Sequence, residues 1–161
     1  MSSEANLPRP PQGISRWLYR APILLYRLRL GWLLGNRALL LEHTGRVSGR
    51  LRRTVLEVIR ADPRQHIYVV VSGFGTQSDW YRNLLAQPAV QVIVGTSRIP
   101  VDAATLSQEQ AQVELRLYED HHPGMLRFLA ERLLGLKVEE GEEGLQKLMG
   151  LFPVVRFERR V

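Results

Sequence analysis

The chain of 161 residues contains no cysteine, which excludes disulfides, thiolate nucleophiles and cysteine-containing metal sites. Its four histidines do not have the spacing of a metal site either. His43 and His66 lie far along the chain from His121 and His122, and two adjacent residues of a helix or strand point in different directions. We therefore expect no metal ion.

Motifs of two common enzyme classes are also missing. No G-x-S-x-G sequence indicates a serine hydrolase. Gly73 and Gly75 form a G-x-G pair, but the third glycine of a dinucleotide-binding fingerprint does not follow. Chemistry carried by a bound cofactor needs few reactive side chains, because the protein then supplies orientation, charge and exclusion of water.

The sequence has no long apolar run. Arg20, Arg27 and Arg29 interrupt the most apolar segment, 17–34, whereas a membrane-spanning helix needs about 20 apolar residues in succession. Residues 1–13 are polar and proline-rich, which predicts a disordered tail and not a signal peptide. We expect one domain over 14–161, in the cytoplasm.

Acidic residues are absent between Glu4 and Glu42, and the net charge of the chain is +6. This charge favours an anionic partner: nucleic acid, a membrane surface or a phosphorylated small molecule. The arginines do not alternate with aromatic residues in a nucleic-acid-binding motif, so no nucleic acid is expected. The basic, tryptophan-containing segment 14–37 predicts a helix that packs on the domain or contacts a membrane surface.

Apolar alternation and turn residues predict an α+β protein. The predicted strands are 39–44, 55–59, 66–72, 90–94, 99–103 and 151–157, and the predicted helices after the first are 80–86, 107 to about 120, 125–134 and 144–149. The strands succeed one another as hairpins, without helical crossovers. They therefore predict a small barrel of about six mainly antiparallel strands flanked by helices.

The chain is organised around the hairpin 39–56, whose turn runs from Gly45 to Gly49. Four arginines and three hydroxyl side chains surround this turn: Arg46, Arg50, Arg52, Arg53, Thr44, Ser48 and Thr54. Guanidinium groups, hydroxyls and loop amides together suit a phosphate or a carboxylate. The alternative is a basic turn that only faces solvent.

Two stretches resemble the signatures of the deazaflavin (coenzyme F420)-dependent nitroreductase and quinone reductase family. The first is Thr44-Gly45-Arg46-x-Ser48-Gly49-x-x-Arg52, and the second is Ser78-Asp79-Trp80-Tyr81-x-Asn83-Leu84-x-Ala86-x-Pro88. The likeness covers 39–103. The closing segment 152–155 also resembles the final strand of the family. It implies a split β-barrel related to FMN-binding barrels.

The resemblance also implies a function: hydride transfer from reduced coenzyme F420 to a quinone, a nitro compound or an activated enone. It implies these cofactor-binding residues: Thr44, Gly45, Arg46, Ser48, Gly49, Arg50, Arg52, Arg53, Thr54, Ser72, Gly73, Phe74, Gly75 and Trp80. Tyr81 and Tyr118 are the candidate catalytic proton donors. Asn83 is expected to bridge main-chain groups, and Trp80 has a structural alternative as an anchor of its helix.

Three departures from the family pattern leave alternatives open. Val47 and Val55 replace a common lysine and a common proline, and Gly73-Phe74-Gly75 lacks the polar residue that often follows the serine. FMN is therefore the alternative cofactor, and a non-catalytic flavin- or deazaflavin-binding or carrier protein on the same barrel is the alternative function. The physiological acceptor and the oligomeric state are open.

Overall fold

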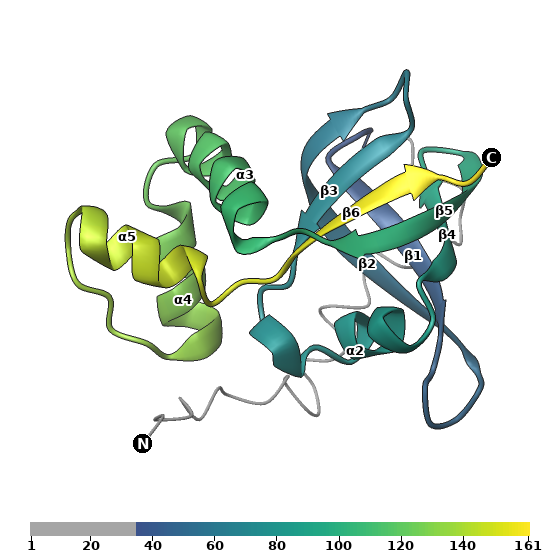
Figure 1. Cartoon of the computed structure of the whole chain (residues 1–161), viewed down its shortest axis with the longest axis horizontal. Helices are drawn as coiled ribbons and strands as arrows, with labels where there is room; N and C mark the ends of the chain where they lie inside the picture. The colour runs from purple at the N-terminus through teal and green to yellow at the C-terminus, as the bar shows by residue number, and fades with distance from the viewer. Residues whose placement is uncertain (1–34) are drawn as a thin grey trace.

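The computed structural model describes residues 35–161 (Figure 1). The expected tail 1–13 and most of the expected helix 14–37 lie outside the described residues. The elements are β1 (Ala38–Thr44), β2 (Leu51–Asp62), β3 (Ile67–Val71), the short 3-10 helix η2 (Gly75–Gln77), α2 (Asp79–Ala86), β4 (Ala89–Val94), β5 (Ser97–Thr105), α3 (Gln108–His121), α4 (Met125–Leu134), α5 (Glu142–Met149) and β6 (Val154–Arg159).

The six strands close into a barrel in the order β1-β2-β3-β6-β5-β4. Every neighbouring pair is antiparallel, including the pair β1–β4 that closes the barrel. Closure leaves no unpaired sheet edge. The prediction of an α+β protein with a barrel of about six mainly antiparallel strands is confirmed.

Two apolar clusters form the core of the described part of the chain. The interior cluster fills the barrel with residues such as Leu41, Val70 and Phe157, and α2 contributes to it. The outer cluster lies between the barrel wall and α3, α4 and α5, which Figure 1 shows together on one side of the barrel. Strand β3 contributes Val70 to the first cluster and Val69 to the second, so it is buried on both faces, as its run of valines predicts.

Several boundaries differ from the prediction, and two of them bear on the site. Strand β2 begins at Leu51, so the basic run belongs to the strand, where Arg53 pairs with Glu42 of β1. Strand β6 begins at Val154, because Pro153 has no N–H for the sheet and its carbonyl instead accepts from Ser72 N–H. The capping box predicted at the start of α3 is present, between Ser107 and Gln110.

The turn between β2 and β3 contains a strained residue, His66, with φ of 52°. Its ring Nδ1 is buried and has no hydrogen-bond partner in the described part of the chain. Replacing His66 with glycine removes both costs, so we expect the free energy of unfolding to rise by about 1 kcal/mol.

Thermal or urea unfolding measures this change. His66→Ala is the matched control: it removes the ring but retains the Cβ that disfavours positive φ. It should be less stable than His66→Gly, and the reverse order would contradict the interpretation.

Candidate anion-binding site and apolar pocket

The loop between β1 and β2 is closed by its own hydrogen bonds. Gly45 N–H donates to the Arg50 carbonyl at 2.8 Å, and Gly49 N–H donates to the Gly45 carbonyl at 2.8 Å. Arg50 N–H donates to Ser48 Oγ at 3.3 Å. Gly49 has φ of +65°, which favours glycine, and a Cβ on Gly45 would lie 2.6 Å from Ser48 Oγ, so the serine hydroxyl would have to rotate away. The loop is therefore preformed.

Arg46 connects this loop to α2 through hydrogen bonds and an ion pair. Its backbone N–H and its Nη1 both donate to Asn83 Oδ1, at 3.0 Å each. Its guanidinium also pairs with Asp79 at 3.2 Å, where the Asp79 side chain is 79% exposed. Such an exposed pair contributes little stability, so an anionic ligand can compete with Asp79 for this arginine.

The barrel mouth is the end of the barrel at which β1 ends and α2 packs. Cross-strand partners share a face, and Arg52 pairs with His43 while Thr54 pairs with Leu41 of the interior cluster. Arg52 and Thr54 therefore lie on the interior-facing side of β2, at the mouth. Arg52 has no carboxylate partner among the described residues.

Arg53 lies on the opposite face of β2. Its Nε donates to Glu42 Oε1 at 2.9 Å, and Arg98 of β5 binds the other oxygen of the same carboxylate. Glu42 is only 5% exposed, so these two arginines neutralise a buried charge. The four arginines of the hairpin thus do not all gather at the mouth: Arg46 and Arg52 do, and Arg53 does not. Arg50 is exposed beside the loop. Thr44 is partly buried at the end of β1, on the face of Glu42.

Two buried polar residues connect the mouth to α2. Asn83 Nδ2 lies 3.0 Å from His43 Nδ1, and His43 Nε2 lies 3.4 Å from Thr54 Oγ1. Burial, together with the positive charge of Arg52, lowers the pKa of His43 from 6.5 to about 4. The imidazole is therefore neutral at neutral pH.

The segment from Ser72 to Ser78 also borders α2. Ser72 is fully buried, and its Oγ lies 2.7 Å from both the Gly75 carbonyl and Ser78 Oγ. These two bonds hold the loop, and the predicted cofactor contact of Ser72 stays a prediction. Ser78 precedes α2 at the N-cap position but makes no side-chain cap, because its hydroxyl faces Ser72. Gly73 and Phe74 are partly exposed, and Gly75 is buried with φ of +63°.

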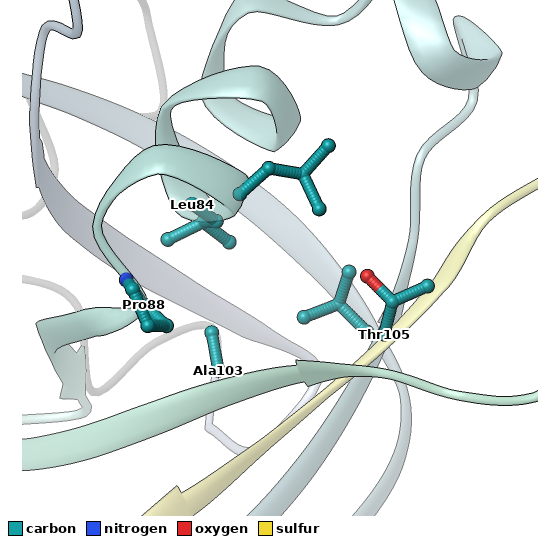
Figure 2. A pocket seen from close by; sticks show the side chains of 6 residues that line it. Leu84, Pro88, Ala103 and Thr105 are labelled. Atoms are coloured by element: carbon teal, nitrogen blue, oxygen red, sulfur yellow. The ribbon is translucent and has the colours of Figure 1, made fainter.

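A small pocket lies between α2 and the strands β5 and β6. It has a volume of about 170 Å³ and is lined by Leu84, Leu85, Pro88, Ala103, Thr105 and Val155. Figure 2 shows Leu84 on the helix and Ala103 and Thr105 on the facing strand. The side chains that line it are apolar except for Thr105, but polar atoms form as much of the pocket surface as apolar atoms do. The pocket therefore suits a small molecule that has both apolar atoms and hydrogen-bonding oxygens.

The two tyrosines proposed as proton donors are not brought together. Tyr81 belongs to the interior cluster, and its hydroxyl accepts from Thr105 Oγ1 at 3.2 Å, next to the pocket. Tyr118 belongs to the outer cluster and donates to Glu57 Oε1 at 3.2 Å. Burial, and the carboxylate of Glu57, raise the pKa of Tyr118 to about 12.

Trp80 is partly buried against the interior cluster and meets Tyr81 edge-on, with ring centroids 6.1 Å apart. Trp80 thus helps to anchor α2 to the interior cluster. Asn83 bridges a main-chain N–H, as expected, and His43 is the residue of the mouth that the sequence interpretation missed. The period-2 series Leu39, Leu41, His43 could have placed it on the inner face of the strand.

A closed antiparallel barrel of six strands flanked by helices is the split β-barrel fold. Two solved structures show this fold. An F420-H2-dependent reductase (FDR-A) superposes with a TM-score of 0.53 at 22% identity, over 76% of this chain and 94% of that one. An FMN-binding protein from Nostoc punctiforme, related to pyridoxamine 5'-phosphate oxidase, gives 0.50 at 14% identity, over 92% and 83%.

The chain belongs to the F420H(2)-dependent quinone reductase family, whose model matches residues 27–139. A similar protein is Rv3178 of Mycobacterium tuberculosis, named for the same activity, with 34% identity over 86 residues, which are 52% of this chain and 71% of that protein. The chain is thus an F420-dependent oxidoreductase with coenzyme F420 as its cofactor. The predicted family, enzyme class and cofactor are confirmed.

Within residues 35–161, no helix combines the length and the apolarity needed to cross a bilayer. The expected membrane contact through 14–37 falls almost entirely outside the described residues, so it stays a prediction.

Proposed function

We propose that this enzyme transfers a hydride from reduced F420 to a quinone, and that the barrel mouth binds the phosphate and carboxylates of the coenzyme. The observation that carries the proposal is the pair Arg46 and Arg52, which lie beside a closed glycine loop. Among residues 35–161, the exposed Asp79 is the only carboxylate that forms an ion pair with either of them. Arginine suits such oxygens because its planar donors can bind two of them at once.

The other residues divide by position. Ser48, Arg50 and Thr54 lie around the same loop and complete the set of donors for the charged part of the coenzyme. Gly45 and Gly49 shape the loop. Gly73 and Phe74 lie in the loop before α2, and Trp80 lies in the first turn of α2. These three residues are assigned to the planar ring, which glycines allow to approach the backbone closely.

The pocket beside Thr105 is assigned to the acceptor. Ser72 N–H donates to the Pro153 carbonyl, which places the 72–75 loop next to the start of β6, and Val155 of β6 lines the pocket. A quinone has a planar apolar ring and two carbonyl oxygens, which matches apolar side chains beside the Thr105 hydroxyl and other polar atoms. When bound, the coenzyme supplies the hydride. Tyr81 supplies the proton, since its hydroxyl lies 3.2 Å from Thr105 Oγ1, a lining residue of the pocket, and a phenol can donate to the acceptor oxygen.

A cofactor and acceptor panel tests the function. Fluorescence titration should show that F420 binds more tightly than FMN or FAD. Turnover of reduced F420 should then be faster with menadione than with a nitroaromatic compound or an activated enone. Tighter binding of FMN, or quinone turnover below that of both other acceptors, would overturn the proposal.

The role of Tyr81 is tested by comparing Tyr81→Phe with Tyr118→Phe. We expect Tyr81→Phe to lower kcat with menadione about a hundredfold, the range of a lost general acid, with F420 affinity unchanged. Tyr118→Phe should keep its kcat, because Tyr118 donates to Glu57 on the outer face of the barrel. Equal kcat values for the two variants would show that the proton comes from elsewhere.

A further inference from the structure

The orientation of the Asn83 side-chain amide is fixed by its neighbours. Its Oδ1 meets two groups that can only donate, the Arg46 N–H and the Arg46 Nη1. Its Nδ2 must therefore face His43, at 3.0 Å from Nδ1. The assignment follows from the donors alone, without knowledge of any hydrogen position.

The orientation of Asn83 then fixes the tautomer of His43. An Nδ1 atom that accepts from the Asn83 amide carries no hydrogen, so a neutral imidazole carries its hydrogen on Nε2. That nitrogen lies 3.4 Å from Thr54 Oγ1 and donates to it. Both His43 and Asn83 are 4% exposed, so water cannot readily exchange for either partner.

The chain of donors ends at the Thr54 hydroxyl. This oxygen already accepts from His43, and its own hydrogen has no acceptor within residues 35–161. The hydroxyl lies on the inner face of β2, two residues from Arg52, at the barrel mouth. The Thr54 hydroxyl can therefore donate a hydrogen bond to a ligand bound in the mouth.

We propose that His43 is a positioning residue for coenzyme binding: it holds Asn83, which secures the Arg46 loop, and it presents the Thr54 hydroxyl as a donor to an anionic oxygen of the coenzyme. This inference rests on the proposed placement of the phosphate and carboxylates at the mouth. It goes beyond that proposal by assigning a function to a histidine that touches no ligand.

Three substitutions separate the two hydrogen bonds of His43, one with Asn83 and one with Thr54. His43→Asn retains a polar atom near the position of Nδ1, so it keeps the contact to Asn83 but cannot reach Thr54. His43→Phe keeps the ring but removes both contacts. Thr54→Val removes the terminal donor with little change of shape, and Thr96→Val, in the exposed turn between β4 and β5, is its matched control.

The measurement is the Kd, by fluorescence, of F420 and of the deazaflavin nucleoside that lacks the phosphate and the tail. We expect Thr54→Val and His43→Asn each to weaken F420 about tenfold, as for one lost hydrogen bond to a charged group, with nucleoside affinity unchanged. The double variant His43→Asn/Thr54→Val should match Thr54→Val, because the two residues act as one unit. His43→Phe should weaken F420 further, since it also releases the Arg46 loop.

Three outcomes would overturn the inference. One is an unchanged Kd for F420 in both Thr54→Val and His43→Asn. Another is an equal loss for F420 and the nucleoside, which indicates a general structural defect. The third is additive losses in the double variant. A wild-type protein that binds the nucleoside as tightly as F420 would instead refute the proposed placement of the coenzyme, and this result does not depend on any variant.

Discussion

Replacing Arg52 with alanine is expected to weaken F420 binding about a hundredfold, the upper range for a lost charge-assisted hydrogen bond. Arg52 lies on the mouth side of β2 beside His43, and it has no carboxylate partner in the described part of the chain. Its charge is therefore available to the coenzyme. Fluorescence titration of oxidised F420 gives the change in Kd directly.

Arg53→Ala is the control that makes this experiment specific. It removes the same charge from the adjacent residue, but Arg53 points to the outer face of β2 and binds Glu42. We expect it to leave the F420 Kd unchanged and to lower stability, because the buried Glu42 carboxylate then keeps Arg98 as its one cationic partner within residues 35–161. Equal losses of affinity in the two variants would show that general positive charge attracts the coenzyme, and that no particular arginine binds it.

Salt dependence gives a second readout. A charge contact that faces solvent is screened by added salt, so the F420 Kd of the wild type should rise with ionic strength. This rise should be shallower in Arg52→Ala and unchanged in Arg53→Ala. The comparison separates a lost ionic contact from a change in the shape of the mouth.

The contrast between Arg52 and Arg53 shows where sequence interpretation ends. The sequence predicts the hairpin, its glycine turn and the basic run, because these depend on local turn chemistry and apolar alternation. It does not assign faces within the run, since the predicted strand began at Val55 and left the arginines in a loop. The register of β1 with β2 decides which arginine faces the mouth, and a shift of one residue would exchange them.

The contacts of Asn83 illustrate a second limit. Its partners Arg46 and His43 are 37 and 40 residues away in the chain, and only closure of the barrel with α2 across its end brings them together. The place of Tyr118 in the outer cluster, beside Glu57, also depends on distant contacts. The amphipathic pattern of α3 predicts a helix, but the side of the barrel on which it packs depends on where β5 ends, at Thr105.

The largest loss of stability is expected from Gly144→Ala in α5. A Cβ at this position would lie 1.9 Å from the Glu139 carbonyl oxygen and 2.8 Å from its carbon. Both atoms belong to the backbone, so no change of rotamer can relieve the overlap, and α5 must move away from the preceding loop. The cost of such overpacking is about 3 kcal/mol or more. Exposed ion pairs in the same region, such as Lys147 with Glu139, are too weak to offset it.

Gly150→Ala is the matched control at the other end of the helix. Gly150 has ordinary helical angles, with φ of −72°, and the nearest atom to its added Cβ is the Lys147 carbonyl oxygen at 3.5 Å. Thermal unfolding should therefore show a Tm close to that of the wild type for Gly150→Ala and a much lower Tm for Gly144→Ala. Because α5 packs in the outer cluster and contributes nothing to the barrel mouth, the F420 Kd of folded Gly144→Ala should stay unchanged. A Gly144→Ala protein as stable as Gly150→Ala would contradict the close approach of α5 to Glu139.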